Sequence, residues 1–113
     1  MHELSIAINI IEIVNEEAAK AKAKRVTDIE LEVGSLSGIE IEALELALEV
    51  SVKETIMQHA ILKIVRKQAM AHCNSCKSDF SCESLFDPCP TCNGFDYKVF
   101  QGQEMIVKSL AIE

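Results

Sequence analysis

Four of the five cysteines form two C-x-x-C pairs, and their spacing is that of ligands to a single metal ion. Cys73 and Cys76 form the first pair, Cys89 and Cys92 form the second, and twelve residues separate the pairs. Two residues between thiols let one tight turn direct both sulfurs at one ion, and two such turns complete a tetrahedron. A redox dithiol would need only one pair. We therefore predict a structural Zn(II) site, because four thiolates leave no open position for water.

The residues around these pairs favour a rigid module that does not read nucleic acid. Pro88 and Pro90 flank Cys89 and restrict the backbone there. Cys82 lies between the pairs at spacings that fit no single tight turn, so we interpret it as a partly buried free thiol. The segment carries one lysine, Lys77, against three acidic residues, and this balance disfavours a nucleic-acid-binding zinc module.

The N-terminus, MHELS, offers a second set of metal ligands. The bulky His2 protects the initiator methionine from removal, so we expect Met1 to keep a free α-amine. That amine, a deprotonated backbone amide at residue 2 or 3 and the His2 imidazole can chelate one ion in a plane, with an oxygen of Glu3 nearby. Such planar nitrogen ligation suits Ni(II) or Cu(II). The alternative is a loose terminus whose histidine has no role.

Composition limits the fold and the partners. The 113 residues, 49% of them hydrophobic, suffice for one core and a small appendage. No apolar run is long enough to span a bilayer and no secretory signal is recognisable, so we expect a cytoplasmic protein with reduced cysteines. The net charge of -7 disfavours both nucleic acid and anionic membranes as partners.

Hydrophobic periodicity predicts the elements that must position these residues. Residues 4–21 and 40–55 have helical spacing, with one apolar face each. Residues 26–33, VTDIELEV, alternate as a half-exposed strand does, and a GSLSG turn follows whose serines can cap the second helix. Residues 60–67 and 104–113 read as two further strands, one on each side of the cysteine segment.

This order of elements predicts an α+β fold. We expect a small three-stranded sheet covered by two helices, with a zinc-ribbon-like domain inserted before the last strand. The first domain would comprise residues 1–69 plus 101–113, and the insert residues 70–100. The helix between the first two strands permits a parallel, right-handed crossover.

Several motifs in this order resemble one known family. MHELS at the start, LEVGSLSG after the first helix, PCPTC in the second cysteine pair and GQEMIVKSLAIE at the end resemble the HypA/HybF family of nickel-insertion accessory proteins. The resemblance covers essentially the whole chain. It is specific because it combines a second-position histidine with a cysteine-rich insert.

The resemblance implies a nickel metallochaperone and not an enzyme. In that family Ni(II) binds reversibly at the terminus, here through His2 with Met1 and Glu3, while the four paired cysteines hold structural zinc. It also implies partners: a nickel-binding maturation GTPase, the [NiFe]-hydrogenase large subunit and, in some organisms, urease accessory proteins. The family fold is an α+β nickel-binding domain with a separate zinc domain, and the oligomeric state would be a monomer or a homodimer.

Two features depart from the family pattern, and one other function stays open. Some relatives have histidines beside both cysteine pairs, whereas here Lys77 and Asn93 follow the pairs and only His72 adjoins one. A zinc site that exchanges ligands is thereby disfavoured. Ser35 stands where many relatives have an acidic residue, so we assign that turn no role in metal binding, and we interpret His59 as an exposed loop residue. The alternative function is a zinc-stabilised protein-interaction module without nickel.

Overall fold

The chain forms two compact units. A computed structural model describes the backbone of residues 2–113 and the side chains of residues 3–113. The helical unit contains the residues up to Glu32 together with Ile39–Val65 and Ile106–Glu113, and the cysteine unit contains Val33–Gly38 and Arg66–Met105. In this described part of the chain, no helix is long and apolar enough to cross a membrane.

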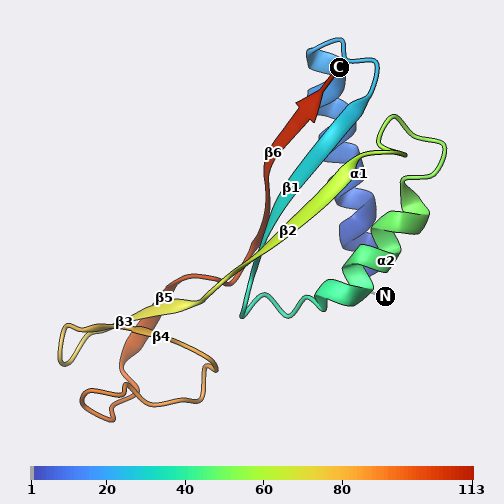
Figure 1. Cartoon of the computed structure of the whole chain (residues 1–113). Helices are drawn as coiled ribbons and strands as arrows, with labels where there is room; N and C mark the ends of the chain where they lie inside the picture. The colour runs from blue at the N-terminus through green and yellow to red at the C-terminus, as the bar shows by residue number, and fades with distance from the viewer. Residues whose placement is uncertain (1) are drawn as a thin grey trace. The chain divides into compact units, whose positions relative to one another are not determined.

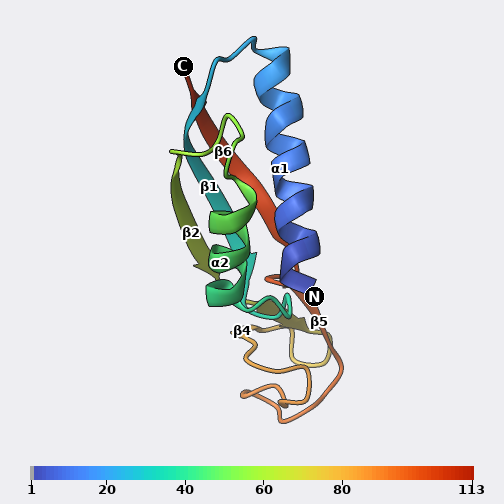
Figure 2. The ribbon, with the colours of Figure 1, turned by 90° about the vertical axis from the view of Figure 1, so that its right-hand side faces the viewer.

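Two helices cover one face of a sheet in the helical unit (Figure 2). Helix α1 spans His2–Lys20 and helix α2 spans Ile41–Ser51, and the two pack against each other. The buried face of α1 repeats every three or four residues, so one side of the helix is entirely apolar. Its fully buried members are Ala7, Ile10, Val14 and Ala18. Both predicted helices are confirmed, with α2 shorter than expected.

The sheet of the helical unit has three strands in the order β2-β1-β6. Strand β1 spans Val26–Gly34, β2 spans Ile61–Lys67 and β6 spans Met105–Ile112. Strand β1 runs parallel to β2 and antiparallel to β6 (Figure 1). The alternation predicted for β1 is present, since Ile29, Leu31 and Val33 are at most 4% exposed. On the opposite face of the sheet, Lys108 Nζ lies 3.1 Å from a Glu32 oxygen. The expected α+β fold is confirmed.

The predicted serine cap of α2 is wrong. The N-cap residue is Glu40, and its side chain makes no capping hydrogen bond. The Ser35 hydroxyl instead accepts a hydrogen bond from the backbone N–H of Ala69 at 2.9 Å. The Glu40 N–H donates to a Glu3 carboxylate oxygen at 3.3 Å, so a side chain from α1 binds the backbone at the start of α2.

The cysteine unit contains a second three-stranded sheet that the sequence analysis did not predict. Its strands are Met70–Cys73 (β3), Asp79–Ser81 (β4) and Tyr97–Gln101 (β5), and β3 lies between β4 and β5 and is antiparallel to both. Strands this short show too little alternation to be recognised. Their core consists of Ala69, Ala71, Cys73, Phe80, Cys82 and Cys89.

The segment Val33–Gly38 belongs to the cysteine unit, whereas the sequence analysis placed it in the first domain. Its backbone meets the 101–104 turn, since the Leu36 N–H donates to Gly102 O at 2.8 Å. A Cβ atom added to Gly34 would lie 2.2 Å from Gly102 O, so only glycine allows this close approach. The compact units therefore differ from the predicted division, 1–69 with 101–113 against 70–100, in this segment and by a few residues at each end of the insert.

Candidate metal centre

The first C-x-x-C pair forms a tight turn at the end of β3. The Lys77 N–H donates to Cys73 O at 3.0 Å, and the Cys73 N–H donates to Ser78 O at 2.8 Å. Lys77 has a φ of 64°, a left-handed conformation that is uncommon for a residue with a long side chain. The turn brings the sulfurs of Cys73 and Cys76 to the same side.

The second pair repeats the same backbone pattern. The Asn93 N–H donates to Cys89 O at 2.7 Å, and the Cys89 N–H donates to Gly94 O at 2.8 Å. Asn93 has a φ of 59°, and asparagine tolerates this region better than most residues. The two pairs are therefore equivalent turns that face each other.

The four sulfurs lie at the spacing of a tetrahedral zinc site. Cys73 Sγ is 3.6 Å from Cys92 Sγ, and Cys76 Sγ is 3.7 Å from Cys89 Sγ. All four sulfurs lie within 4.8 Å of one another. Four thiolates at the usual Zn–S distance would be separated by about 3.8 Å. The donor set thus fits zinc, and among the described residues it is the one group of three or more potential ligands that meets.

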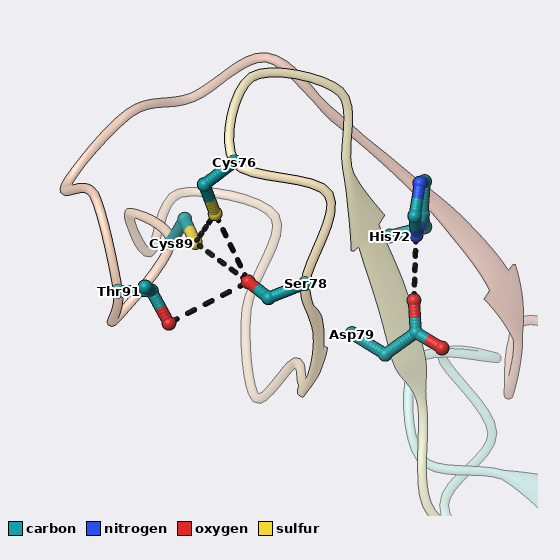
Figure 3. A network of polar contacts seen from close by, with 6 residues as sticks. All are labelled: His72, Cys76, Ser78, Asp79, Cys89 and Thr91. Carbon is teal, nitrogen blue, oxygen red and sulfur yellow. Dashed lines mark hydrogen bonds and ion pairs between the residues drawn. The ribbon is translucent and has the colours of Figure 1, made fainter.

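Ser78 contributes a hydroxyl group to this cluster, as Figure 3 shows. Its Oγ lies 3.0 Å from Cys76 Sγ, 3.9 Å from Cys89 Sγ and 3.5 Å from Thr91 Oγ1. A hydroxyl that donates to sulfur stabilises a thiolate and orients it as a ligand. Sequence reasoning missed Ser78, and its position two residues after Cys76 was the only available signal.

Hydrogen bonds to sulfur prepare part of the cluster for metal binding. The Ser78 hydroxyl, followed by its backbone N–H, lowers the pKa of Cys76. The backbone N–H of Cys92 is the main cause that lowers the pKa of Cys89 to about 6. The Gly94 N–H favours the Cys92 thiolate as well, but the neighbouring thiols and desolvation outweigh it and raise the pKa of Cys92 to about 11. Without a metal ion the four thiols therefore do not all ionise near pH 7.

The fifth cysteine and the described histidines lie apart from this cluster. Cys82 is a buried free thiol whose Sγ lies 3.2 Å from Ser84 O. His72 Nδ1 lies 2.6 Å from an Asp79 oxygen, and in Figure 3 this pair stands beside the sulfurs and not among them. His59 is exposed in a turn.

Of the three residues predicted to bind nickel, Glu3 is the one whose side chain the structure describes. Met1 and the side chain of His2 lie outside the described residues. Glu3 lies in the first turn of α1, and its carboxylate accepts the hydrogen bond from the N–H of Glu40. A planar chelate at the terminus therefore stays a prediction.

The sequence matches a family of known proteins along nearly its whole length. The family described as "Hydrogenase/urease nickel incorporation, metallochaperone, hypA" matches residues 1–112. The hydrogenase maturation factor HypA of Geotalea uraniireducens is 40% identical over 113 residues, covering all of both chains. That of Parabacteroides distasonis is 41% identical over 115 residues, covering 100% of this chain and 98% of the relative.

Two solution structures have the same fold. The Ni metallochaperone HypA from Helicobacter pylori is 25% identical, with a TM-score of 0.71 over 97% of this chain and 96% of that chain. A second HypA protein is 27% identical, with a TM-score of 0.75 over 100% of this chain and 97% of that chain.

Proposed function

Because this chain belongs to the HypA family of hydrogenase and urease nickel-incorporation metallochaperones, we propose that it binds Ni(II) at its own N-terminus and delivers it to a maturing enzyme. The ligands would be the α-amine of Met1, a backbone amide nitrogen, the His2 imidazole and a Glu3 oxygen. The ion is cargo, and the chain performs no catalytic step on it.

The observation that carries this proposal is the start of α1 at His2. The first backbone N–H groups of a helix have no intrahelical acceptor, so one of them can lose its proton to a metal without breaking a helical hydrogen bond. The buried Ala7 and Ile10 anchor the first turns of this helix. An anchored helix that begins at the second residue supports a chelate formed by nitrogen atoms in successive positions of the chain.

The same helix end supports release of the ion. The N-terminal end of a helix carries a partial positive charge, which repels a bound cation. The Glu3 carboxylate and the deprotonated amide offset this repulsion. Ligation by a chain terminus also lets the ligands of a recipient displace the donors one at a time. Cu(II) would bind such a site more tightly than Ni(II), so selectivity in the cell depends on metal supply.

We further propose that Cys73, Cys76, Cys89 and Cys92 hold Zn(II) permanently. The spacing of their sulfurs supports this assignment, and four thiolate ligands leave no position for water. The bound ion would fix the two turns to each other. Its role is to fold the cysteine unit and not to take part in nickel transfer.

Family membership supports a proposal for the partners and the location. We propose a nickel-binding maturation GTPase and the [NiFe]-hydrogenase large subunit as partners, with urease accessory proteins as further partners in organisms that contain urease. We propose that the protein acts in the cytoplasm, where these enzymes mature.

The test is a Ni(II) titration by calorimetry of zinc-loaded protein in three forms. The first has the native terminus, the second carries a few additional residues before Met1, and the third is His2→Gln, which removes the imidazole but keeps a bulky second residue so that Met1 is retained. We expect one Ni(II) to bind the first form and none to bind the other two, with the zinc content unchanged. His59→Ala is the matched control, because it removes an exposed histidine elsewhere, and it should bind nickel as the parent does.

Two results would contradict the terminal site. Equal binding by the native and extended forms would place nickel elsewhere. Retention of zinc with no response of any form to Ni(II) would favour the alternative function, a zinc-stabilised protein-interaction module. Magnetic susceptibility gives an independent reading, because planar Ni(II) is diamagnetic and octahedral Ni(II) is not.

A further inference from the structure

The cysteine unit exposes three of the four phenylalanine side chains of the protein. Phe86 is 88% exposed, Phe95 is 65% exposed and Phe100 is 54% exposed, whereas Phe80 is buried. Leu85, next to Phe86, is 55% exposed. Exposed aromatic side chains of this size are characteristic of surfaces that bind another protein.

The loop that carries Phe86 is held in place by its own hydrogen bonds. The Phe86 N–H donates to the Ser84 hydroxyl at 3.2 Å, and the Asp87 N–H donates to Ser84 O at 3.2 Å. The Cys82 thiol donates to the same carbonyl at 3.2 Å. These bonds form a defined turn, so the exposed phenyl group is presented from a fixed backbone.

Tyr97 ties this turn to the core of the cysteine unit. Its hydroxyl lies 2.6 Å from Asp87 O and 3.1 Å from Leu85 O, one on each side of Phe86. Its ring packs edge-on against Phe80, with 5.0 Å between the ring centroids. The backbone is thus ordered before any partner arrives, and a preorganised anchor loses less entropy on binding than a mobile one.

Charge near Phe86 indicates the kind of partner. Glu83 and Asp87 lie on either side of Leu85 and Phe86 in the sequence, both are exposed, and residues 82–88 include no basic side chain. A surface complementary to this turn has an apolar pocket for the phenyl ring and basic residues at its rim.

A second copy of the chain fits this description poorly. A pocket of 380 Å³ in the helical unit is lined by the apolar residues Ile10, Leu48 and Met57 among others, but Glu45 and Glu49 also line it. These carboxylates would face those of Glu83 and Asp87. The net charge of -7 on each copy adds to the repulsion.

We propose that the Leu85–Phe86 turn is the surface through which the chain docks on its nickel recipient. Phe86 would insert into an apolar pocket of that protein, and Lys or Arg side chains there would face Glu83 and Asp87. This inference rests on the proposed function, because the carrier must hold the recipient while the ion is transferred.

The experiment measures the binding of full-length, zinc-loaded variants to the unprocessed large subunit of a [NiFe]-hydrogenase by biolayer interferometry. We expect Phe86→Ser to weaken binding by at least about ten-fold, as loss of a buried aromatic anchor does. Phe100→Ser, which removes an exposed phenylalanine from β5, should stay within about two-fold of the parent. Tyr97→Phe keeps the aromatic ring but removes the hydroxyl contacts to Leu85 O and Asp87 O, so the turn is held less firmly and binding should show an intermediate loss through faster dissociation.

The outcomes separate this inference from the proposed function. Unchanged binding by Phe86→Ser, equal losses in the Phe86 and Phe100 variants, or no binding of the parent to the large subunit would each overturn the docking surface. Nickel and zinc stoichiometries are measured on the same samples and should not change in Phe86→Ser. Normal nickel binding with unaltered docking would therefore leave the carrier function standing without this surface.

Discussion

Replacement of Gly102 by alanine should strongly destabilise the cysteine unit. Gly102 lies in the turn between β5 and β6 and has a φ of 91°. A Cβ atom added there would lie 2.3 Å from the Cα and 2.7 Å from the backbone nitrogen of Ala69. These neighbours are main-chain atoms, so no rotation of a side chain can relieve the overlap.

The size of the effect follows from two contributions. A residue other than glycine in the left-handed region costs about 1 kcal/mol. Insertion of a methyl group into a packed site costs about 1–3 kcal/mol, and the upper end applies because backbone must move. The sum, about 3–4 kcal/mol, is a large part of the roughly 5–15 kcal/mol that stabilises a typical domain.

Gly38 provides a matched control in the same unit. Its φ is 77°, but nothing lies within 4 Å of a Cβ atom added there. Gly38→Ala therefore carries the conformational cost alone and should lose about 1 kcal/mol. The difference between the two variants isolates the steric contribution.

The assay is chemical denaturation followed by two intrinsic signals. The chain has no tryptophan and one tyrosine, Tyr97, which lies in the cysteine unit. Tyrosine fluorescence therefore reports on that unit, whereas far-UV circular dichroism reports mainly on α1 and α2 of the helical unit. We expect the denaturant concentration at the midpoint of the fluorescence transition to fall much further below that of the parent in Gly102→Ala than in Gly38→Ala.

Equal midpoints for these two variants would refute the steric reasoning. A second variant tests which atoms are responsible. Gly102→Ala combined with Ala69→Gly removes one methyl group but leaves the Ala69 backbone in place, so it should restore little stability. Full recovery in the double variant would show that the methyl groups, and not the main chain, cause the loss.

Four further predictions concern the metal centre and the sheet. Cys73→Ser should abolish zinc binding, measured by atomic absorption, and should disorder the cysteine unit while the helical dichroism is largely kept; retained zinc would contradict the assigned ligands. Ser78→Ala should lower zinc affinity by about ten-fold in competition with a chromogenic chelator, because two sulfurs lose a hydroxyl neighbour, and an unchanged affinity would remove Ser78 from the site. Lys77→Gly should raise the free energy of unfolding by up to about 1 kcal/mol, measured by urea denaturation, since φ at this position is 64°; a loss would mean that the lysine side chain matters more than its backbone. The Glu32 carboxylate, then Glu30, raises the pKa of Lys108 above its ordinary 10.5, so this ion pair stabilises the fold below that pH and is lost as the pH rises through the raised pKa. Lys108→Met should therefore unfold at slightly lower urea at pH 7, and the difference from the parent should vanish at higher pH; a difference independent of pH would refute the assignment.

Periodicity predicted the long elements of the helical unit but not the orientation of every face. The alternation of β1 placed its buried residues correctly because one face of the sheet is covered by helices. For α1 the helical spacing does not fix which apolar residues face the core, and the structure buries Ile10 and leaves Ile8 50% exposed. Apolar residues are so frequent along this helix that two neighbouring stripes satisfy the same spacing, and only tertiary packing selects one.

The candidate metal centre was likewise predictable only in part from the sequence. The convergence of the four paired cysteines could be predicted because C-x-x-C spacing is a local property of the chain. Ser78 could not, because its hydroxyl reaches the sulfur of Cys89 only after both turns have formed. Strands β3, β4 and β5 were missed since their stability comes from the cysteine core and not from local pattern.

The close approach of Gly102 to Ala69 also joins the two ends of the insert. Between β2 and β6 the chain runs through about 40 residues, and an unfolded loop of that length has a closure entropy worth about 3 kcal/mol. A folded cysteine unit keeps these ends together and acts as a cross-link for strands far apart in the sequence. Loss of zinc would release that cross-link, so the helical unit should also melt at a lower temperature. The supply of zinc would thereby affect the stability of a protein whose proposed cargo is nickel.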